Sequence, residues 1–208
     1  MSQRLRTGIA ALDRQLEGGI PSGSIVALTA SPASQAELFL YELTATRGTL
    51  YLTLDRTSDA VANSLNAAPA RTGQATVRDV TGDAPLDNAS KLVAALPESS
   101  NLIIDPVDVL ERHEPARYRN FINELQNHIY NTGGLAVLHC LDGRDVPVLR
   151  DTTEHMADVV FQLETTVKGD RIENRLAVPK FRGGRALSDV IKLDLAAAID
   201  IDTSRDIA

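Results

Sequence analysis

Short apolar runs alternate with helical patterns along this chain as far as Cys140. The runs have the length of buried strands, and the segments between them place apolar residues three or four positions apart. The predicted strands span residues 24–29, 49–54, 75–80, 101–104 and 135–140, and the predicted helices span 34–46, 58–65, 86–96 and 116–130. Strands that alternate with helices favour βαβ units, and thus an α/β fold with a mainly parallel twisted sheet flanked by helices on both faces.

The chain changes character after Met156. Segments 159–165, 171–181 and 188–195 are predicted to be consecutive strands joined by glycine-containing turns. We therefore expect a C-terminal antiparallel extension of the sheet. Residues 196–208 are small and acidic and are predicted to form a short frayed tail, so that residues 1–195 make a single domain.

The turn after the first predicted strand has the position of a phosphate-binding loop. Such a loop has the pattern G-x-x-x-x-G-K-[ST], whose backbone N–H groups, lysine and hydroxyl contact phosphates and Mg²⁺. In the segment Ala30–Glu37, the two glycines are replaced by Ala30 and Gln35, the lysine by Ala36 and the hydroxyl residue by Glu37. The segment keeps the position of a phosphate loop without its chemical groups.

Ser34 and Glu37 match the S-x-x-E pattern of a capping box. This pattern predicts that the Ser34 hydroxyl accepts a hydrogen bond from the N–H of Glu37, and that the Glu37 carboxylate accepts one from the N–H of Ser34. A carboxylate near the first turn of a helix also repels a phosphate from that position. The sequence therefore predicts a loop that folds without a ligand and does not hydrolyse nucleotide.

The composition narrows the remaining classes of function. The 208-residue chain has a net charge of −7 and 4% aromatic residues, which disfavours broad binding to nucleic acid. No apolar run reaches the roughly 18–20 residues of a membrane span, and the polar N-terminus lacks the apolar region of a signal peptide. We therefore expect a cytoplasmic protein. Its single cysteine, Cys140, cannot form an internal disulfide and is predicted to be a core residue.

Several motifs occur together in a recognisable order. They are Thr7-Gly8-Ile9, Leu12-Asp13, Leu16, Gly18-Gly19-Ile20-Pro21 and Gly23-Ser24 at the start, then Leu102-Ile103-Ile104-Asp105, Ala157-Asp158-Val159-Val160 and the turn Lys180-Phe181-Arg182-Gly183. This order resembles the RecA superfamily of ATPases, in particular its KaiC/RadA-like branch, over residues 7–195. The resemblance implies a RecA-like P-loop NTPase fold with a degenerate Walker A loop, in a family that binds ATP between neighbouring subunits.

The resemblance also assigns roles to residues at the strand ends. Asp105 takes the place of the Walker B aspartate that holds Mg²⁺ through water; the alternative, favoured without the lysine and the hydroxyl, is an aspartate that satisfies the turn at Pro106. Asp55 lies near the position of a catalytic glutamate, but Arg56 is expected to neutralise it, or Asp55 opens a helix cap. His139 takes the place of a residue that senses the γ-phosphate; the alternative is a hydrogen-bonded structural histidine.

Lys180 and Arg182 are the remaining candidates for nucleotide contact. In hexameric relatives, this turn reaches across the interface to the nucleotide of the neighbouring subunit. Alternate residues of a strand point to the same side, so the two cations can act together. The alternative is a solvated hairpin that carries two cations. The four histidines show no metal-ligand spacing with Cys140, so no metal site is predicted.

Three functions remain, in decreasing order of preference. The first is a catalytically degenerate RecA/KaiC-like ATPase homologue, a pseudo-ATPase that acts as a regulatory or protein-interaction module. It has no catalytic residues, and it binds ATP and Mg²⁺ only if the degenerate loop still holds them. The second is a subunit that completes an active partner's ATP site in trans, and the third is a RadA-like DNA recombination or repair accessory. The expected partner is a protein, either a second copy or a RecA/KaiC-like ATPase, and not a membrane.

Overall fold

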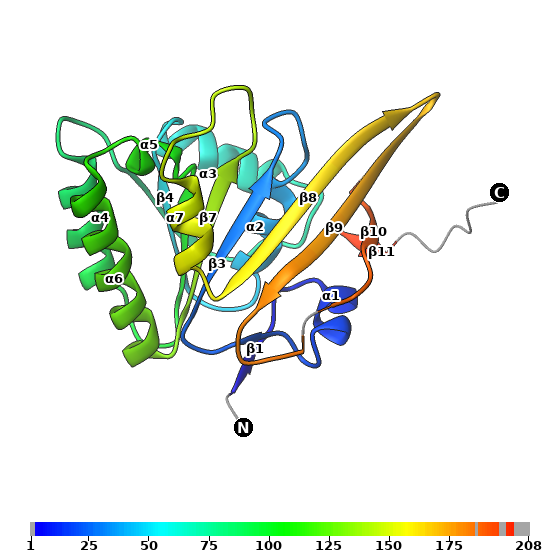
Figure 1. Cartoon of the computed structure of the whole chain (residues 1–208), viewed down its shortest axis with the longest axis horizontal. Helices are drawn as coiled ribbons and strands as arrows, with labels where there is room; N and C mark the ends of the chain where they lie inside the picture. Colours follow the sequence, from blue (N-terminus) through cyan, green and yellow to red (C-terminus); the bar gives the residue numbers. More distant parts are fainter. Residues whose placement is uncertain (1–2, 186, 196–198, 202–208) are drawn as a thin grey trace.

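The computed structural model describes residues 3–185, 187–195 and 199–201 (Figure 1). The strands of its main sheet are β3 (Ser24–Ala30), β4 (Thr49–Thr53), β5 (Ala75–Asp79), β6 (Asn101–Asp105), β7 (Leu135–Leu141), β8 (Val159–Lys168), β9 (Arg171–Phe181), β10 (Ile191–Asp194) and β11 (Asp200–Ile201). Within the described ranges, they form one nine-stranded sheet in the order β11-β10-β9-β8-β3-β7-β6-β4-β5. The strands from β8 to β5 in this order are parallel, and β9, β10 and β11 are antiparallel. The predicted fold class is confirmed.

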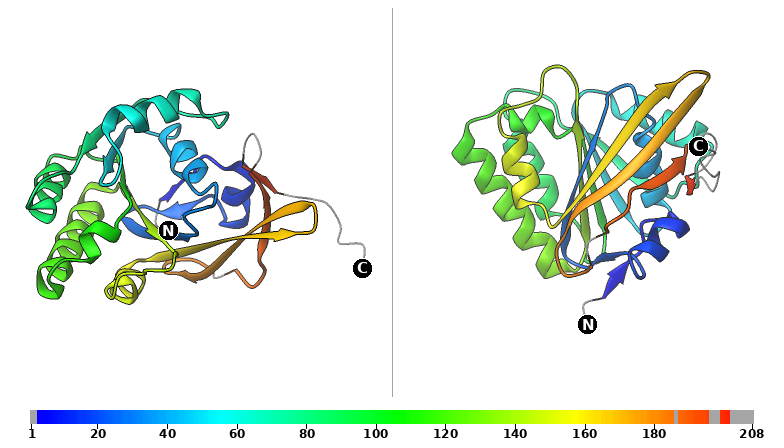
Figure 2. Two further views of the ribbon diagram at one scale, coloured as in Figure 1. Left: turned by 90° about the horizontal axis from the view of Figure 1, so that it is seen from above. Right: turned by 45° about the vertical axis from the view of Figure 1, so that its right-hand side comes forward.

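Helices cover both faces of this sheet (Figure 2). They are α1 (Ala10–Gln15), α2 (Glu37–Thr44), α3 (Ser58–Ala67), α4 (Pro85–Ala94), α5 (Asp108–Glu111), α6 (Pro115–Thr132) and α7 (Arg150–Met156). Buried apolar side chains of α1, α2 and α3 belong to one hydrophobic core, and those of α4, α5 and α6 belong to a second core. The sheet therefore separates two cores, as a doubly covered parallel sheet requires.

The central strand β3 shows how the sequence produces this layering. Val26 and Leu28 pack into the first core, whereas Ile25 and Ala27 pack into the second. Successive side chains of a strand point to opposite faces of the sheet, and here both faces are covered by a hydrophobic core. The continuous apolar run, with no polar alternation, is thus the pattern expected for a strand covered on both sides.

The predicted C-terminal antiparallel extension of the sheet is present, and α7 determines where it begins. β8 pairs with β3 in parallel, so the antiparallel part of the sheet begins only at β9. The reason is α7, a helix that the sequence analysis did not predict. A helical crossover returns the chain to the same end of the sheet and so produces a parallel neighbour, whereas a short turn produces an antiparallel one.

Some element boundaries also differ from the prediction. The structure places α2 at Glu37–Thr44 instead of residues 34–46, and β10 at Ile191–Asp194 instead of residues 188–195. β11 falls within the segment predicted as a tail, and residues 196–198 and 202–208 of that segment lie outside the described residues. The N-terminal segment adds a small antiparallel pair, β1 (Arg4–Leu5) with β2 (Ile20–Pro21), that the sequence analysis missed.

A buried arginine joins the elements at one end of the second core. Arg150, at the start of α7, is 5% exposed. Its guanidinium donates to Glu111 at 2.9 and 3.1 Å, to Asp108 at 2.8 Å, and to the carbonyl of Leu141 at 3.0 Å. Both carboxylates come from α5, and Leu141 ends β7. Arg150 therefore fixes α7 and α5 against the sheet through a buried ion-pair network.

We expect Arg150→Met to lower the free energy of unfolding by about 3–5 kcal/mol, because it leaves the carboxylates of Asp108 and Glu111 buried without a cation. The matched control is Arg117→Met, which removes an exposed ion pair to Asp87 and should cost less than about 1 kcal/mol. Urea denaturation of both variants measures the difference. Equal losses in the two variants would contradict a structural role for the buried network.

Candidate functional site

The carboxyl ends of the central parallel strands surround a small cavity. Ligands of open α/β sheets bind at this edge. The cavity has a volume of about 190 Å³. It lies between the turn after β3 and the ends of β4, β6 and β7, and its polar lining residues are Ser31, Ser34, Glu37, Asp55, Arg56, Asp105 and His139. The structure therefore brings together the β3–α2 turn, Asp105 and His139 at one edge of the sheet.

The turn that precedes α2 closes on itself. The N–H of Ser34 donates to the carbonyl of Ser31 at 2.9 Å, and the Ser34 hydroxyl donates to the same carbonyl at 2.7 Å. The helix begins at Glu37, and its N-cap residue, Ala36, has no side-chain cap. The predicted capping box is therefore wrong. Ser34 is used within the preceding turn, and Glu37 is the first residue of the helix and not its third.

Glu37 instead forms an ion pair across the cavity. Its carboxylate lies 2.9 Å from the guanidinium of Arg56 and accepts a hydrogen bond from the Tyr41 hydroxyl at 3.2 Å. Arg56 also donates to the Ser64 hydroxyl at 2.6 Å, on α3. The pair therefore ties the first turn of α2 to α3. It also places a carboxylate at the helix N-terminus, where the positive end of the dipole favours an anion.

Asp55 does not have the partner that the sequence predicts. Arg56 turns toward Glu37 and Ser64, so it does not neutralise Asp55. The cap of α3 is Thr57, whose hydroxyl accepts from the N–H of Ala60 at 3.3 Å, so the alternative role for Asp55 is also wrong. Partial desolvation raises the pKa of Asp55, and nearby carboxylates raise it further.

Three neighbouring strands contribute one side chain each to a buried hydrogen-bonded chain. The Tyr51 hydroxyl on β4 donates to Asp105 on β6, and Nδ1 of His139 on β7 lies 2.6 Å from the other oxygen of Asp105. All three residues are less than 9% exposed. The Asp105 carboxylate thus bonds to Tyr51 and His139, and not to the turn at Pro106 as the structural alternative predicts. His139 is a hydrogen-bonded structural side chain, which is the second of its two interpretations.

The electrostatics of this chain follow from its burial. Burial by itself would raise the pKa of Asp105, but the hydrogen bond and charge of His139 and the hydrogen bond from Tyr51 lower it overall. Burial and the charge of Asp105 raise the pKa of Tyr51, so the phenol keeps its proton and donates it. The second ring nitrogen of His139, Nε2, is buried and has no hydrogen-bond partner within the described part of the chain.

Lys180 and Arg182 lie apart from this cavity, beside the C-terminal end of α7. The Lys180 ammonium donates to the carbonyls of Glu154 and His155 at 2.8 and 2.7 Å, and Arg182 donates to the His155 carbonyl at 3.0 Å. Cations stabilise the unpaired carbonyls at the end of a helix. Both side chains reach the carbonyl of His155, and in this chain they cap α7. Their contact with the nucleotide of a neighbouring subunit stays a prediction.

Two further expectations concern metal ligands and Cys140. In residues 3–185, 187–195 and 199–201, no group of three histidine, cysteine or acidic side chains could hold a metal ion. Cys140 is fully buried in the second core, and burial raises the pKa of its thiol, so its prediction as a core residue is confirmed. Among the described helices, none has the length and apolarity to cross a bilayer.

Comparison with known proteins identifies the family. Residues 4–208 match the model of a family of unknown function, DUF7125. The chain belongs to this family. Among solved structures it is similar to a KaiC-like protein from the hyperthermophilic archaeon Pyrococcus horikoshii OT3, with a TM-score of 0.78 and 16% sequence identity over 97% of this chain and 100% of that one. This likeness shows that the DUF7125 chain has a RecA/KaiC-like fold. No curated protein matches it.

The sequence analysis missed two participants in this site of the DUF7125 chain. The strand pattern of residues 49–54 predicts no role for Tyr51, although a buried phenol needs a hydrogen-bond partner, which is a usable signal. Arg56 was paired with its sequence neighbour Asp55, because the partner that it contacts, Glu37, lies 19 residues away in the sequence. No local pattern identifies such a partner.

We expect the stability of the DUF7125 chain to fall as the pH drops below about 4, the ordinary pKa of an aspartate. The pKa of Asp105 is lowered in the folded state. The unfolded chain therefore takes up this proton first, and the stability contributed above that pH is lost on acidification. In Asp105→Asn this loss should be smaller, whereas Asp83→Asn, an exposed control, should keep the wild-type profile. Urea denaturation between about pH 5 and pH 2.5 tests this, and parallel profiles for wild type and Asp105→Asn would contradict it.

Proposed function

We propose that this DUF7125 chain is a RecA/KaiC-like domain that does not hydrolyse ATP and acts as a regulatory or protein-interaction module. The observation that carries the proposal is the Glu37–Arg56 ion pair at the start of α2. In a P-loop NTPase, the first turn of this helix faces the phosphates. Here a side-chain carboxylate and its own cation occupy that position. We therefore interpret the segment Ala30–Glu37 as a degenerate Walker A loop.

The groups around this loop do not fit ATP and Mg²⁺. The N–H of Ala36 in the loop donates to the Ser34 hydroxyl, and those of Leu38 and Phe39 in the first turn of α2 donate to the carbonyls of Gln35 and Ala36. These three N–H groups are therefore not directed at an external anion. No lysine or hydroxyl side chain stands at the end of the loop, where P-loop NTPases contact phosphate and Mg²⁺. The cavity volume of about 190 Å³ is also below the roughly 300–1,000 Å³ of typical ligand pockets.

A projecting hairpin supports the interaction role. β8 and β9 extend beyond the body of the molecule as a long hairpin (Figure 1). Val167 and Ile172 face each other near its tip and are 75% and 68% exposed. Apolar side chains at the tip of a projecting element suit contact with another protein. Lys180 and Arg182 are engaged with α7 carbonyls, which favours this role over completion of a partner's ATP site in trans.

We expect no Mg²⁺-dependent ATP turnover by the purified protein, because the lysine and the hydroxyl that act on the phosphates and Mg²⁺ are absent. A coupled phosphate-release assay tests this, with an active RecA-like ATPase as the positive control. The decisive comparison is with Asp105→Asn. Turnover in the wild-type protein that disappears in Asp105→Asn would contradict the proposal.

We expect the double variant Val167→Thr/Ile172→Thr to weaken binding of the protein partner by about tenfold, because it removes exposed apolar groups while keeping β-branched residues in the strands. Sedimentation velocity measures self-association, and quantitative affinity capture from native cells measures binding of a RecA-like ATPase. Tyr130→Gln removes an exposed aromatic side chain on α6 and is the control. Equal association of the wild type and both variants would exclude the hairpin tip as the contact.

A further inference from the structure

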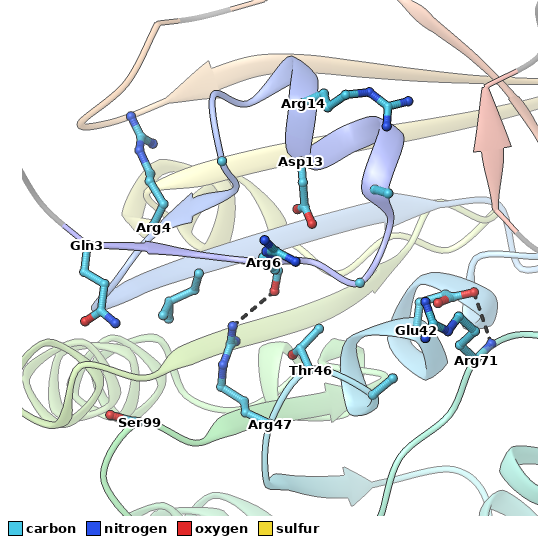
Figure 3. A pocket seen from close by; sticks show the side chains of 15 residues that line it. Gln3, Arg4, Arg6, Asp13, Arg14, Glu42, Thr46, Arg47, Arg71 and Ser99 are labelled. Atoms are coloured by element: carbon cyan, nitrogen blue, oxygen red, sulfur yellow. Dashed lines mark hydrogen bonds between the residues drawn. The ribbon is translucent and has the colours of Figure 1, made fainter.

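A second, larger cavity lies at the opposite edge of the sheet, near the amino ends of β4 and β6 (Figure 3). It has a volume of about 900 Å³ and is formed by the N-terminal segment, the end of α2 and the segments that precede β4, β5 and β6. Five arginines line it: Arg4, Arg6, Arg14, Arg47 and Arg71. We call this cavity the arginine pocket. A chain with a net charge of −7 thus collects five cations around one cavity.

The two acidic residues of the arginine pocket are buried and already used. Asp13 accepts hydrogen bonds from the N–H and the hydroxyl of Thr7, both at 2.8 Å. Glu42 is 3% exposed and accepts from the N–H of Arg71 at 3.2 Å. Burial raises the pKa of Glu42, and the backbone N–H and the charge of Arg71 oppose this rise. The acids therefore hold the backbone around the pocket, while Arg6, Arg14 and Arg71 are exposed and Arg4 and Arg47 are half-buried.

Most of the guanidinium groups are available to a ligand. The side chains of Arg6, Arg14 and Arg71 are exposed and donate no hydrogen bond to any described residue. Arg47 is held in place, because it donates to Oδ1 of Asn101 at 2.5 Å and to the carbonyl of Arg6 at 3.2 Å. Figure 3 shows Arg6 and Arg47 together in the middle of the pocket and Arg71 at one side, beside Glu42. Arg4 lies over the Phe181 ring, 5.3 Å from its centre.

The cations are not needed to cap α2, whose C-terminal end borders the pocket. The carbonyl of Leu43 accepts from the amide of Asn101 at 3.0 Å and from the Thr46 hydroxyl at 2.8 Å. The carbonyl of Tyr41 accepts from the Thr44 hydroxyl at 2.6 Å. Neutral donors thus satisfy these carbonyls. Asp13 interacts electrostatically with Arg47, and Glu42 with Arg71, but five arginines face only these two acids in the lining of the pocket.

Gly8 brings the N-terminal segment against α2 and so shapes the pocket. Its φ is +95°, and a side chain at this position would clash with the backbone carbonyl of Glu42. Only glycine combines this conformation with so close an approach. Arg6 is therefore held opposite Arg47, as their hydrogen bond requires.

We propose that the arginine pocket binds a small, multiply charged phosphate anion of about the size of tripolyphosphate, through Arg6, Arg47 and Arg71. The planar guanidinium fork matches phosphate oxygens bidentately, and several forks around one cavity suit a ligand with several phosphates. The five arginines exceed the two acids in the lining, so the pocket is positive within an acidic chain. This site is at the other edge of the sheet from the Glu37–Arg56 pair and does not depend on the proposed function.

Isothermal titration of the full chain with tripolyphosphate, without Mg²⁺ and at low salt, tests the proposal. The variant is Arg6→Gln/Arg71→Gln, because neither guanidinium has a hydrogen bond that the fold would lose. The control is Arg119→Gln/Arg144→Gln, which makes the same change in net charge at exposed positions elsewhere. We expect the dissociation constant to rise about tenfold or more in the pocket variant and to stay within about twofold in the control.

Three further titrations, with ATP, with the Asp105→Asn variant and with a single-stranded oligonucleotide, test what the pocket recognises. ATP should bind no more tightly than tripolyphosphate if the phosphates are what the pocket recognises. Asp105→Asn should bind tripolyphosphate like the wild type, which separates this site from the carboxyl edge. The proposal is overturned if millimolar tripolyphosphate does not bind, if both double variants weaken it equally, or if a single-stranded oligonucleotide binds more tightly and depends on Arg6 and Arg71. Matching thermal melts of the variants establish that the fold is intact.

Discussion

The hydrogen-bonded chain Tyr51–Asp105–His139 is the interaction on which the carboxyl edge of this sheet depends. It takes one side chain from each of three adjacent parallel strands, β4, β6 and β7. A carboxylate buried at this depth is costly unless hydrogen bonds hold its charged form. Tyr51 and His139 supply those bonds, so the ionised Asp105 fixes the relative positions of the three strand ends. Asp105 and His139 line the cavity at this edge together with the turn after β3 and the first residue of α2.

The charged side chains at the two edges of the sheet are arranged differently. At the carboxyl edge, where a RecA-like fold usually meets nucleotide, Glu37 and Arg56 neutralise each other, and the N–H groups of Ala33, Ser34 and Ala36 bond within the loop. At the amino edge, arginines surround a larger cavity whose acids are buried. In our proposals the fold is retained, its usual ligand site is closed by its own side chains, and anion binding is found at the other edge.

The periodic part of the structure could be predicted from the sequence, and the contacts between distant segments could not. Apolar runs such as Ser24–Ala30 identify strands, because both faces of a parallel sheet bury them. The helix α7 escaped prediction because its polar sequence has no apolar stripe. Local spacing alone predicts that Glu37 is a helix cap. In the structure its partner is Arg56, which lies between α2 and α3. The arginine pocket had no local signal, since its cations are spread from Arg4 to Arg71 in the sequence.

The central claim is that the Glu37–Arg56 ion pair occupies the phosphate position at the carboxyl edge. Its most direct test is a crystal structure of the protein grown with Mg²⁺ and a non-hydrolysable ATP analogue. A closed edge predicts that the Glu37–Arg56 ion pair is intact and that no phosphate lies at the turn before α2, even if the analogue is found in the arginine pocket. Phosphate groups bound at the first turn of α2, with Arg56 displaced from Glu37 and Mg²⁺ near Asp105, would contradict it.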